Sequence, residues 1–133
     1  MHKTIHGIAC VVRGPNNKIL LLKRSPTKKL FPGKWFVVGA YPLNENDDFE
    51  KKAHLEMVDE TGQDGEIINS GELLKMEVDG EVIDVHTFLA RRQTEEVLLN
   101  DEHTEYKWVD QAAIKNFDCV PGMYEMMDNL LKR

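Results

Sequence analysis

Cysteine is scarce in this sequence, and its two cysteines, Cys10 and Cys119, lie far apart and form no CxxC pair. A disulfide framework needs several cysteines and a thiolate zinc site needs closely spaced ones, so the sequence argues against both. Disulfides are rare in the reducing cytoplasm, and the low cysteine content therefore favours a cytoplasmic location.

Long apolar runs and an excess of positive charge are also missing. The apolar stretch at residues 5–12 is too short for a membrane span, which needs about 20 residues, and it lacks the layout of a signal peptide. The chain has 17 basic and 23 acidic side chains, for a net charge of -6. These features argue against binding to a membrane or to nucleic acid. A small anionic ligand stays compatible with them, because it needs only a local cationic cluster or a metal ion.

The length and the apolar periodicity predict one domain over residues 1–133. Strands are predicted at residues 5–14, 18–25, 35–41, 66–78, 81–92 and 105–109, and helices at 47–60, 110–117 and 121–133. The first strand is apolar on both faces, which is typical of the centre of a sheet. Hairpins interrupted by a helix indicate an α/β (α+β) fold, with helices covering both faces of a mixed β-sheet.

Local signals mark several element ends. Asp47 is predicted to be the N-cap of the first helix, with Glu50 three residues later as in a capping box. Gly62 is predicted to end this helix in the left-handed conformation. The dipeptide Asp79-Gly80 predicts a tight hairpin turn. The methionines of the last helix are expected to pack against the core.

Three acids crowd the end of the first helix, in the stretch HLEMVDETGQ (residues 54–63). On a helical wheel with Phe49 at 0°, Glu56 and Glu60 fall at about -20° and about 20°, whereas Asp59 falls at about -80°. Glu56 and Glu60 therefore share the inward face. Like charges at these spacings cost roughly 0.2–0.5 kcal/mol per pair, and the helix dipole opposes acids at this end.

A divalent cation would relieve this repulsion. Carboxylates spaced i, i+3 and i+4 suit Mg²⁺ or Mn²⁺, which bind oxygen ligands and keep water molecules for substrate phosphates. An ordinary solvated acidic face is the alternative. The inward position of two of the three acids favours a metal site, because a buried acid needs a partner.

The same residues resemble the Nudix box, which is written G-x5-E-x7-R-E-U-x-E-E-x-G-U, with U apolar. Residues 55–63, LEMVDETGQ, lie on R-E-U-x-E-E-x-G-U, and Asp47 lies on the first E. Upstream, FPGKWFVVGAY resembles the PGKW lead-in of many Nudix proteins. The order of the predicted elements also resembles the Nudix-type α/β/α sandwich with its mixed β-sheet.

The box departs from the family pattern at several positions. Leu55 stands where the family has an arginine that orients the box carboxylates. Asp47 and Asp59 replace glutamates, which keeps the charge but shortens the reach by one methylene. Glu56 and Glu60 are retained. The metal-binding residues of the box are thus kept, while the residue that orients them is lost.

By this resemblance, Glu56 and Glu60 are expected to be the main metal ligands and Asp59 an accessory one, with backbone carbonyls of Gly39 and Ala40 as a further source. The implied cofactor is Mg²⁺ or Mn²⁺. The implied reaction is attack by metal-activated water on a phosphate of a nucleoside diphosphate linked to another moiety. Such substrates include nucleoside triphosphates, nucleotide sugars and dinucleotides.

The catalytic base is expected to be Glu56, Glu60 or an acid of the loop NDEHTEYKW (residues 100–108). Glu105 is favoured in that loop, because a glutamate three residues before such a tryptophan is frequent in the family. Asp101 and Glu102 are the other candidates, and a solvated acidic turn is the alternative for both.

Four residues are candidates for substrate binding. Arg24 and Lys28 could contact phosphates, and a surface cation is the alternative for each. Trp35 and Phe36 could stack on a base, and core packing is their alternative.

Two other functions are compatible with the resemblance. A Nudix-fold module that binds a nucleotide or metabolite with little turnover is one, and Leu55 motivates it. A diphosphate isomerase that shares the fold is the other, although that class needs an additional catalytic cysteine and neither Cys10 nor Cys119 suits the role. The expected partner is a small nucleotide or another diphosphate. Dimers are common in the family, but the sequence leaves open whether this chain forms a homodimer.

Overall fold

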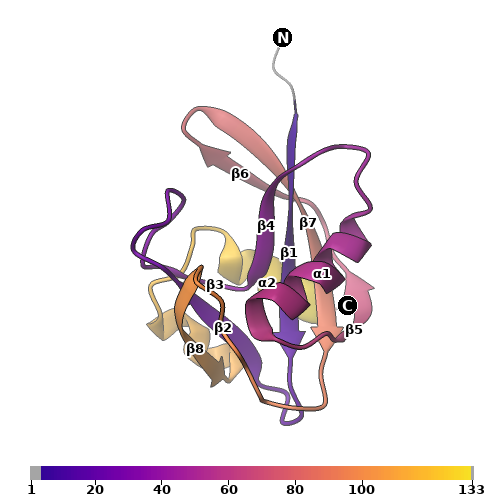
Figure 1. Cartoon of the computed structure of the whole chain (residues 1–133), viewed down its shortest axis with the longest axis vertical. Coiled ribbons are helices and arrows are strands. Elements are labelled where there is room, and N and C mark those ends of the chain that lie inside the picture. The colour runs from indigo at the N-terminus through magenta and orange to yellow at the C-terminus, as the bar shows by residue number, and fades with distance from the viewer. Residues whose placement is uncertain (1–3, 133) are drawn as a thin grey trace.

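The computed structural model describes residues 4–132. Along this part of the chain lie eight strands, two α-helices and one 3-10 helix (Figure 1). Their order is β1 (Ile5–Arg13), β2 (Ile19–Arg24), β3 (Trp35–Phe36), β4 (Val38–Leu43), α1 (Phe49–Thr61), β5 (Glu66–Ser70), β6 (Leu74–Val78), β7 (Glu81–Arg91), β8 (His103–Val109), η1 (Gln111–Asn116) and α2 (Met123–Leu131). No helix in residues 4–132 is both long and apolar enough to cross a membrane.

The eight strands form one mixed sheet, and the predicted α/β/α layering is confirmed. Strand β1 pairs in parallel with β7 along its whole length, and the other pairings are antiparallel. The central position predicted for the first strand is also confirmed, since β1 has neighbours on both edges and is buried over most of its length. The predicted hairpin at Asp79-Gly80 joins β6 to β7.

Alternate residues of β1 pack into two separate hydrophobic cores. Ile8 and Cys10 lie in the cluster that includes Ala53 and Met57 of α1. Ala9 and its alternating neighbours lie in the other cluster, which contains the methionines of α2. Figure 1 shows α1 in front of the sheet and α2 behind it. The expectation that these methionines pack against the core is confirmed, because they are almost completely buried.

Strands β1 and β2 pair near their hairpin, where Arg13 lies opposite Ile19. Farther from this turn β1 pairs with β4 and β2 pairs with β3, while β8 runs along the other edge of β2. The two strands therefore separate. A cavity lies where they part, lined by Gly7 and Ile8 of β1 and by Arg24 of β2.

Two of the predicted strands are each divided in the structure. The predicted strand 35–41 is two strands, of which β4 continues to Leu43. The predicted strand 66–78 is interrupted at Gly71, where an added Cβ would lie 2.7–2.8 Å from Thr87, Asn129 and Leu130. The chain passes too close to α2 there for a continuous strand with side chains. The predicted helix 110–117 is a 3-10 helix.

The predicted N-cap Asp47 is wrong by one residue. Asp48 caps α1, and its Oδ1 accepts a hydrogen bond from the Lys51 N–H at 3.1 Å. Asp47 instead closes the preceding turn by accepting from the Asn44 N–H at 2.8 Å. The predicted C-terminal cap is confirmed, since Gly62 ends the helix at φ 81°.

Candidate functional site

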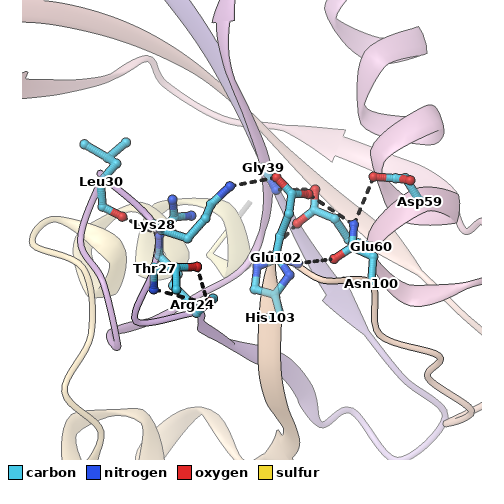
Figure 2. A network of polar contacts seen from close by, with 11 residues as sticks. Arg24, Thr27, Lys28, Leu30, Gly39, Asp59, Glu60, Asn100, Glu102 and His103 are labelled. Carbon is cyan, nitrogen blue, oxygen red and sulfur yellow. Dashed lines mark hydrogen bonds and ion pairs between the residues drawn. The ribbon is translucent and has the colours of Figure 1, made fainter.

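Three carboxylates form a cluster at one side of the cavity. Oxygens of Glu56, Asp59 and Glu102 all lie within 4.8 Å of one another. Helix α1 supplies two of them, and Glu102 comes from the residue before β8. The Asn100 side-chain amide donates to Asp59 Oδ2 at 3.0 Å and to Glu102 Oε2 at 3.1 Å, which ties the loop to the helix (Figure 2).

The carboxylates of this cluster differ in how well neighbouring groups compensate their negative charge. Burial would raise the pKa of Glu102, but hydrogen bonds from Lys28 and Asn100 lower it overall. The Lys28 ammonium lies 2.8 Å from Glu102 Oε1. The pKa of Glu56 is raised by burial and by the charges of Asp59 and Glu102. The negative charges of Asp59 and Glu102 therefore disfavour the ionised form of Glu56.

Glu60 lies behind the cluster and is 1% exposed. The Gly39 N–H donates to its Oε2 at 3.3 Å, and Nε2 of His103 is 3.5 Å from its Oε1. Burial, followed by the neighbouring Glu56 carboxyl, raises the pKa of Glu60 well above its usual range. The helical-wheel prediction is therefore confirmed for Glu60, which faces inward, and for Asp59, which is exposed, whereas Glu56 is half-buried.

His103 is the functional candidate that sequence reasoning missed. Its side chain is 2% exposed, and neither ring nitrogen finds a hydrogen-bond partner among residues 4–132. Burial lowers its pKa to about 4, so the imidazole is neutral near pH 7. A neutral imidazole still carries one N–H, which could donate to the nearby Glu60 carboxylate. No local pattern marked it, because an acidic loop resembles a solvated turn.

The donor set suits a hard divalent cation. All three cluster residues offer carboxylate oxygens, which Mg²⁺ and Mn²⁺ prefer, and the set contains no thiolate or imidazole. Burial, with the charges of Asp59 and Glu102 added to it, raises the pKa of Glu56 and so disfavours its ionised form. A cation bound here would remove that repulsion.

The cavity beside the cluster has a volume of about 410 Å³. Its lining includes the polar side chains of Arg24, Lys28, Glu60, Glu102 and His103. Arg24 Nε donates to the Leu30 carbonyl at 2.7 Å, which holds the loop 26–34 against β2. A second hollow reaches Glu56 and Asp59 and shares Gly39, Ala40, Tyr41 and Glu102 with the first. The cationic side chains of the first hollow and the acids of the second are thus adjacent across these shared residues.

The structure brings together most, but not all, of the predicted site residues. Gly39 and Ala40 line both hollows, and Phe36 lines the cavity. Trp35 instead packs edge-on against Phe117 in the core, with ring centroids 5.3 Å apart. Glu105 lies outside the cluster, and its exposed carboxylate is 3.5 Å from Lys23 Nζ.

Comparisons with known proteins identify a matching family and solved structures that share this fold. The NUDIX domain family matches residues 3–130. No curated protein matches the sequence. The MutT protein from Methanosarcina mazei Go1 superposes with a TM-score of 0.83 at 23% identity, covering 96% of each chain.

Two further solved structures share the fold at lower identity. The NUDIX domain of Shewanella oneidensis NrtR, complexed with ADP ribose, has a TM-score of 0.80 at 12% identity, covering 97% of this chain and 87% of the other. A C. elegans Ap4A hydrolase has a TM-score of 0.78 at 19% identity, covering 95% and 94%. At these identities the likeness concerns the fold.

Proposed function

The chain belongs to the Nudix family, and from that premise we propose that it is a metal-dependent hydrolase that cleaves a nucleoside diphosphate linked to another moiety. The observation that supports this most is the cluster of Glu56, Asp59 and Glu102, because its member Glu102 also lines the cavity that contains Arg24 and Lys28. Acidic side chains that can bind a cation and basic side chains that can bind phosphates thus lie close enough together to contact one ligand.

We assign the cation, Mg²⁺ or Mn²⁺, to Glu56, Asp59 and Glu102, with Glu60 behind them. When bound, such a cation offsets charge on the diphosphate and lowers the pKa of an attacking water. Arg24 and Lys28 are proposed to bind and orient the phosphate oxygens, since both line the cavity that Glu102 also lines.

Glu60 is proposed to accept the proton of the attacking water. Its carboxylate lines the cavity, accepts a hydrogen bond from the Gly39 N–H and lies 3.5 Å from His103 Nε2. A raised pKa makes a carboxylate a stronger base than an exposed one. The fixed position of Glu60 and its basicity both suit this role.

A second candidate is a Nudix-fold module that binds a nucleotide or metabolite with little turnover. Leu55 supports it, because its side chain is 53% exposed on α1 where the family has an orienting arginine. No leucine can donate a hydrogen bond to the box carboxylates.

Hydrolysis assays separate the two candidates. The purified protein would be incubated with Mg²⁺ or Mn²⁺ and a panel of nucleoside triphosphates, dinucleotides and nucleotide sugars, and released phosphate or monophosphate would be measured. If the protein is a hydrolase, Glu56→Gln should abolish turnover and Glu50→Gln should retain it. Glu50→Gln is the matched control, because it makes the same substitution at an exposed position of the same helix. Nucleotide binding without turnover of any substrate supports the binding module instead.

A further inference from the structure

A buried arginine lies at the end of helix α1, close to where the acids gather. Arg92 is the residue after β7, and it is 4% exposed. Its guanidinium has three hydrogen-bond acceptors in residues 4–132, and none of them is a carboxylate. Nη1 donates to Thr61 Oγ1 at 3.0 Å, Nε donates to the Thr94 carbonyl at 3.3 Å, and Nη2 donates to the Glu96 carbonyl. A buried cation is costly unless it is paired, so these neutral acceptors alone do not explain its burial.

The position of Arg92 supplies the missing compensation. The C-terminal end of a helix carries partial negative charge, which favours a nearby cation. The last turn of α1 contains no basic residue and includes Asp59 and Glu60. Leu55, where the family has its arginine, is an exposed apolar side chain. Arg92 reaches this end of the helix from the strand side, at Thr61, the last residue of α1.

The acceptors of Arg92 lie on two segments that it joins. Thr61 belongs to α1, whereas Thr94 and Glu96 belong to the loop 93–102, which leads into β8. The Leu98 N–H of this loop also donates to the Thr61 carbonyl at 2.9 Å. The loop is therefore docked on the end of α1, and the Arg92 guanidinium lies between the two.

Trp108 of β8 contacts both the loop and the arginine. Its indole N–H donates to the Glu95 carbonyl at 2.9 Å. The ring centroid is 5.6 Å from Cζ of Arg92, within the range of a cation–π interaction. The guanidinium is thus held in one orientation, which is what its planar set of donors needs to bind three acceptors at once.

The docked loop ends at residues that complete the acidic cluster. The Asn100 amide donates to Asp59 and to Glu102, as Figure 2 shows. On the side of β2, the Ser25 N–H donates to the Glu102 carbonyl at 2.9 Å. The contacts that dock the loop on α1 therefore help to set how close Glu102 lies to the helix acids.

We propose that Arg92 is a positioning residue of the metal site: it anchors the loop 93–102 to the end of α1 and thereby holds Glu102 beside Glu56 and Asp59. The anchor comes from the end of β7 and not from the helix that carries the box. The part of this inference that concerns a cation rests on the proposed function.

Titration of the nucleotide-free protein with Mn²⁺, followed by electron paramagnetic resonance, tests the inference without turnover. Loss of a residue that orients a metal ligand costs about 10–100-fold in affinity, so Arg92→Met should weaken Mn²⁺ binding by about tenfold or more. Arg92→Lys keeps the charge but not the planar set of donors, and its affinity should lie between the two. Arg91→Gln is the matched control, because Arg91 pairs with Glu66 at the surface, and it should bind like the wild type. Equal affinity of the wild type and both Arg92 variants overturns the inference.

A double-mutant cycle separates positioning from a general loss of stability. Glu102→Gln removes the ligand that Arg92 is proposed to place, so adding Arg92→Met to it should weaken Mn²⁺ binding by less than about threefold. The same loss with and without Glu102→Gln would overturn the inference. Ile114→Val shortens a buried side chain in the core on the α2 side; it should lower the urea midpoint and leave the Mn²⁺ affinity unchanged.

Amide exchange of the metal-free protein tests the anchoring of the loop by itself. The Leu98 N–H should exchange about tenfold faster or more in Arg92→Met, as expected when hydrogen bonds from a charged group are lost. If this variant does not fold, Arg92→Lys takes its place in each measurement, with a smaller effect. Unchanged exchange overturns the anchoring role.

The outcome for the proposed function is separate. If Mn²⁺ binds and depends on Arg92 as expected but no nucleotide is hydrolysed, the hydrolase proposal fails and the role of Arg92 stands. If the wild type hydrolyses nucleotides and Arg92→Met binds Mn²⁺ equally well, the role of Arg92 fails and the hydrolase proposal stands.

Discussion

Replacing the buried Glu60 by glutamine should change how the stability of the metal-free protein depends on pH. Burial and the Glu56 carboxyl raise the pKa of Glu60 in the folded state, whereas the unfolded chain releases the same proton near the ordinary glutamate value. Between these two pKa values the folded state binds more protons than the unfolded state. The free energy of unfolding of the wild type therefore falls as pH rises through this window.

The size of the effect follows from linkage and from the isosteric change. Each pH unit within the window should cost the wild type up to about 1.4 kcal/mol. The glutamine side chain has no titrating proton to lose, and its amide can donate to Glu56 as the protonated Glu60 does. Glu60→Gln should thus gain stability relative to the wild type as pH rises through the window, and it should keep that advantage above the window.

Urea unfolding in EDTA between pH 5 and pH 8 measures this difference. Glu50→Gln removes an exposed carboxyl from the same helix and controls for the loss of one acid. Added Mg²⁺ should reduce the pH dependence of the wild type, because a cation favours the ionised carboxylates. A stability difference between Glu60→Gln and wild type that does not vary with pH would refute the reasoning.

Three further predictions concern helix α1. Asp48→Ala should lower the free energy of unfolding by about 1 kcal/mol through loss of the N-cap, measured by urea, and Asp47→Ala should cost less. Gly62→Ala should cost about 1 kcal/mol or more, because φ is 81° and an added Cβ would lie 2.9 Å from a neighbouring side chain; an unchanged urea midpoint would contradict this. Leu55→Arg should raise any hydrolytic activity, because the new cation lies one turn before Asp59 and offsets the repulsion among the acids. An unchanged or lower kcat/KM for Leu55→Arg would show that position 55 does not weaken the site.

The local geometry of the helix made part of the site predictable from the sequence. A helical repeat fixes which residues share a face, so the inward position of Glu60 and the outward position of Asp59 followed from spacing alone. The same argument failed at the helix start. The capping-box spacing favoured Asp47, but Asp47 closes a turn with Asn44 and leaves the cap to Asp48.

Long-range pairing made the rest unpredictable. Glu102 joins the acids of α1 because β8 pairs with β2 and its preceding loop then reaches the helix end. The burial of His103 has the same origin. The mixed sheet with helices on both faces could be predicted, whereas the separation of β1 from β2, which opens the cavity, depends on which strands pair.

If a cation and a diphosphate bind as proposed, the ion pair between Lys28 and Glu102 makes their affinities interdependent. Lys28 lies 2.8 Å from a carboxylate of the acidic cluster, so a cation that takes Glu102 releases this ammonium for a phosphate. A phosphate that draws Lys28 away leaves Glu102 open to a cation in turn. Such coupling is reciprocal: each ligand tightens the other by the same factor. The pair therefore favours the cation and the diphosphate arriving together over either arriving alone.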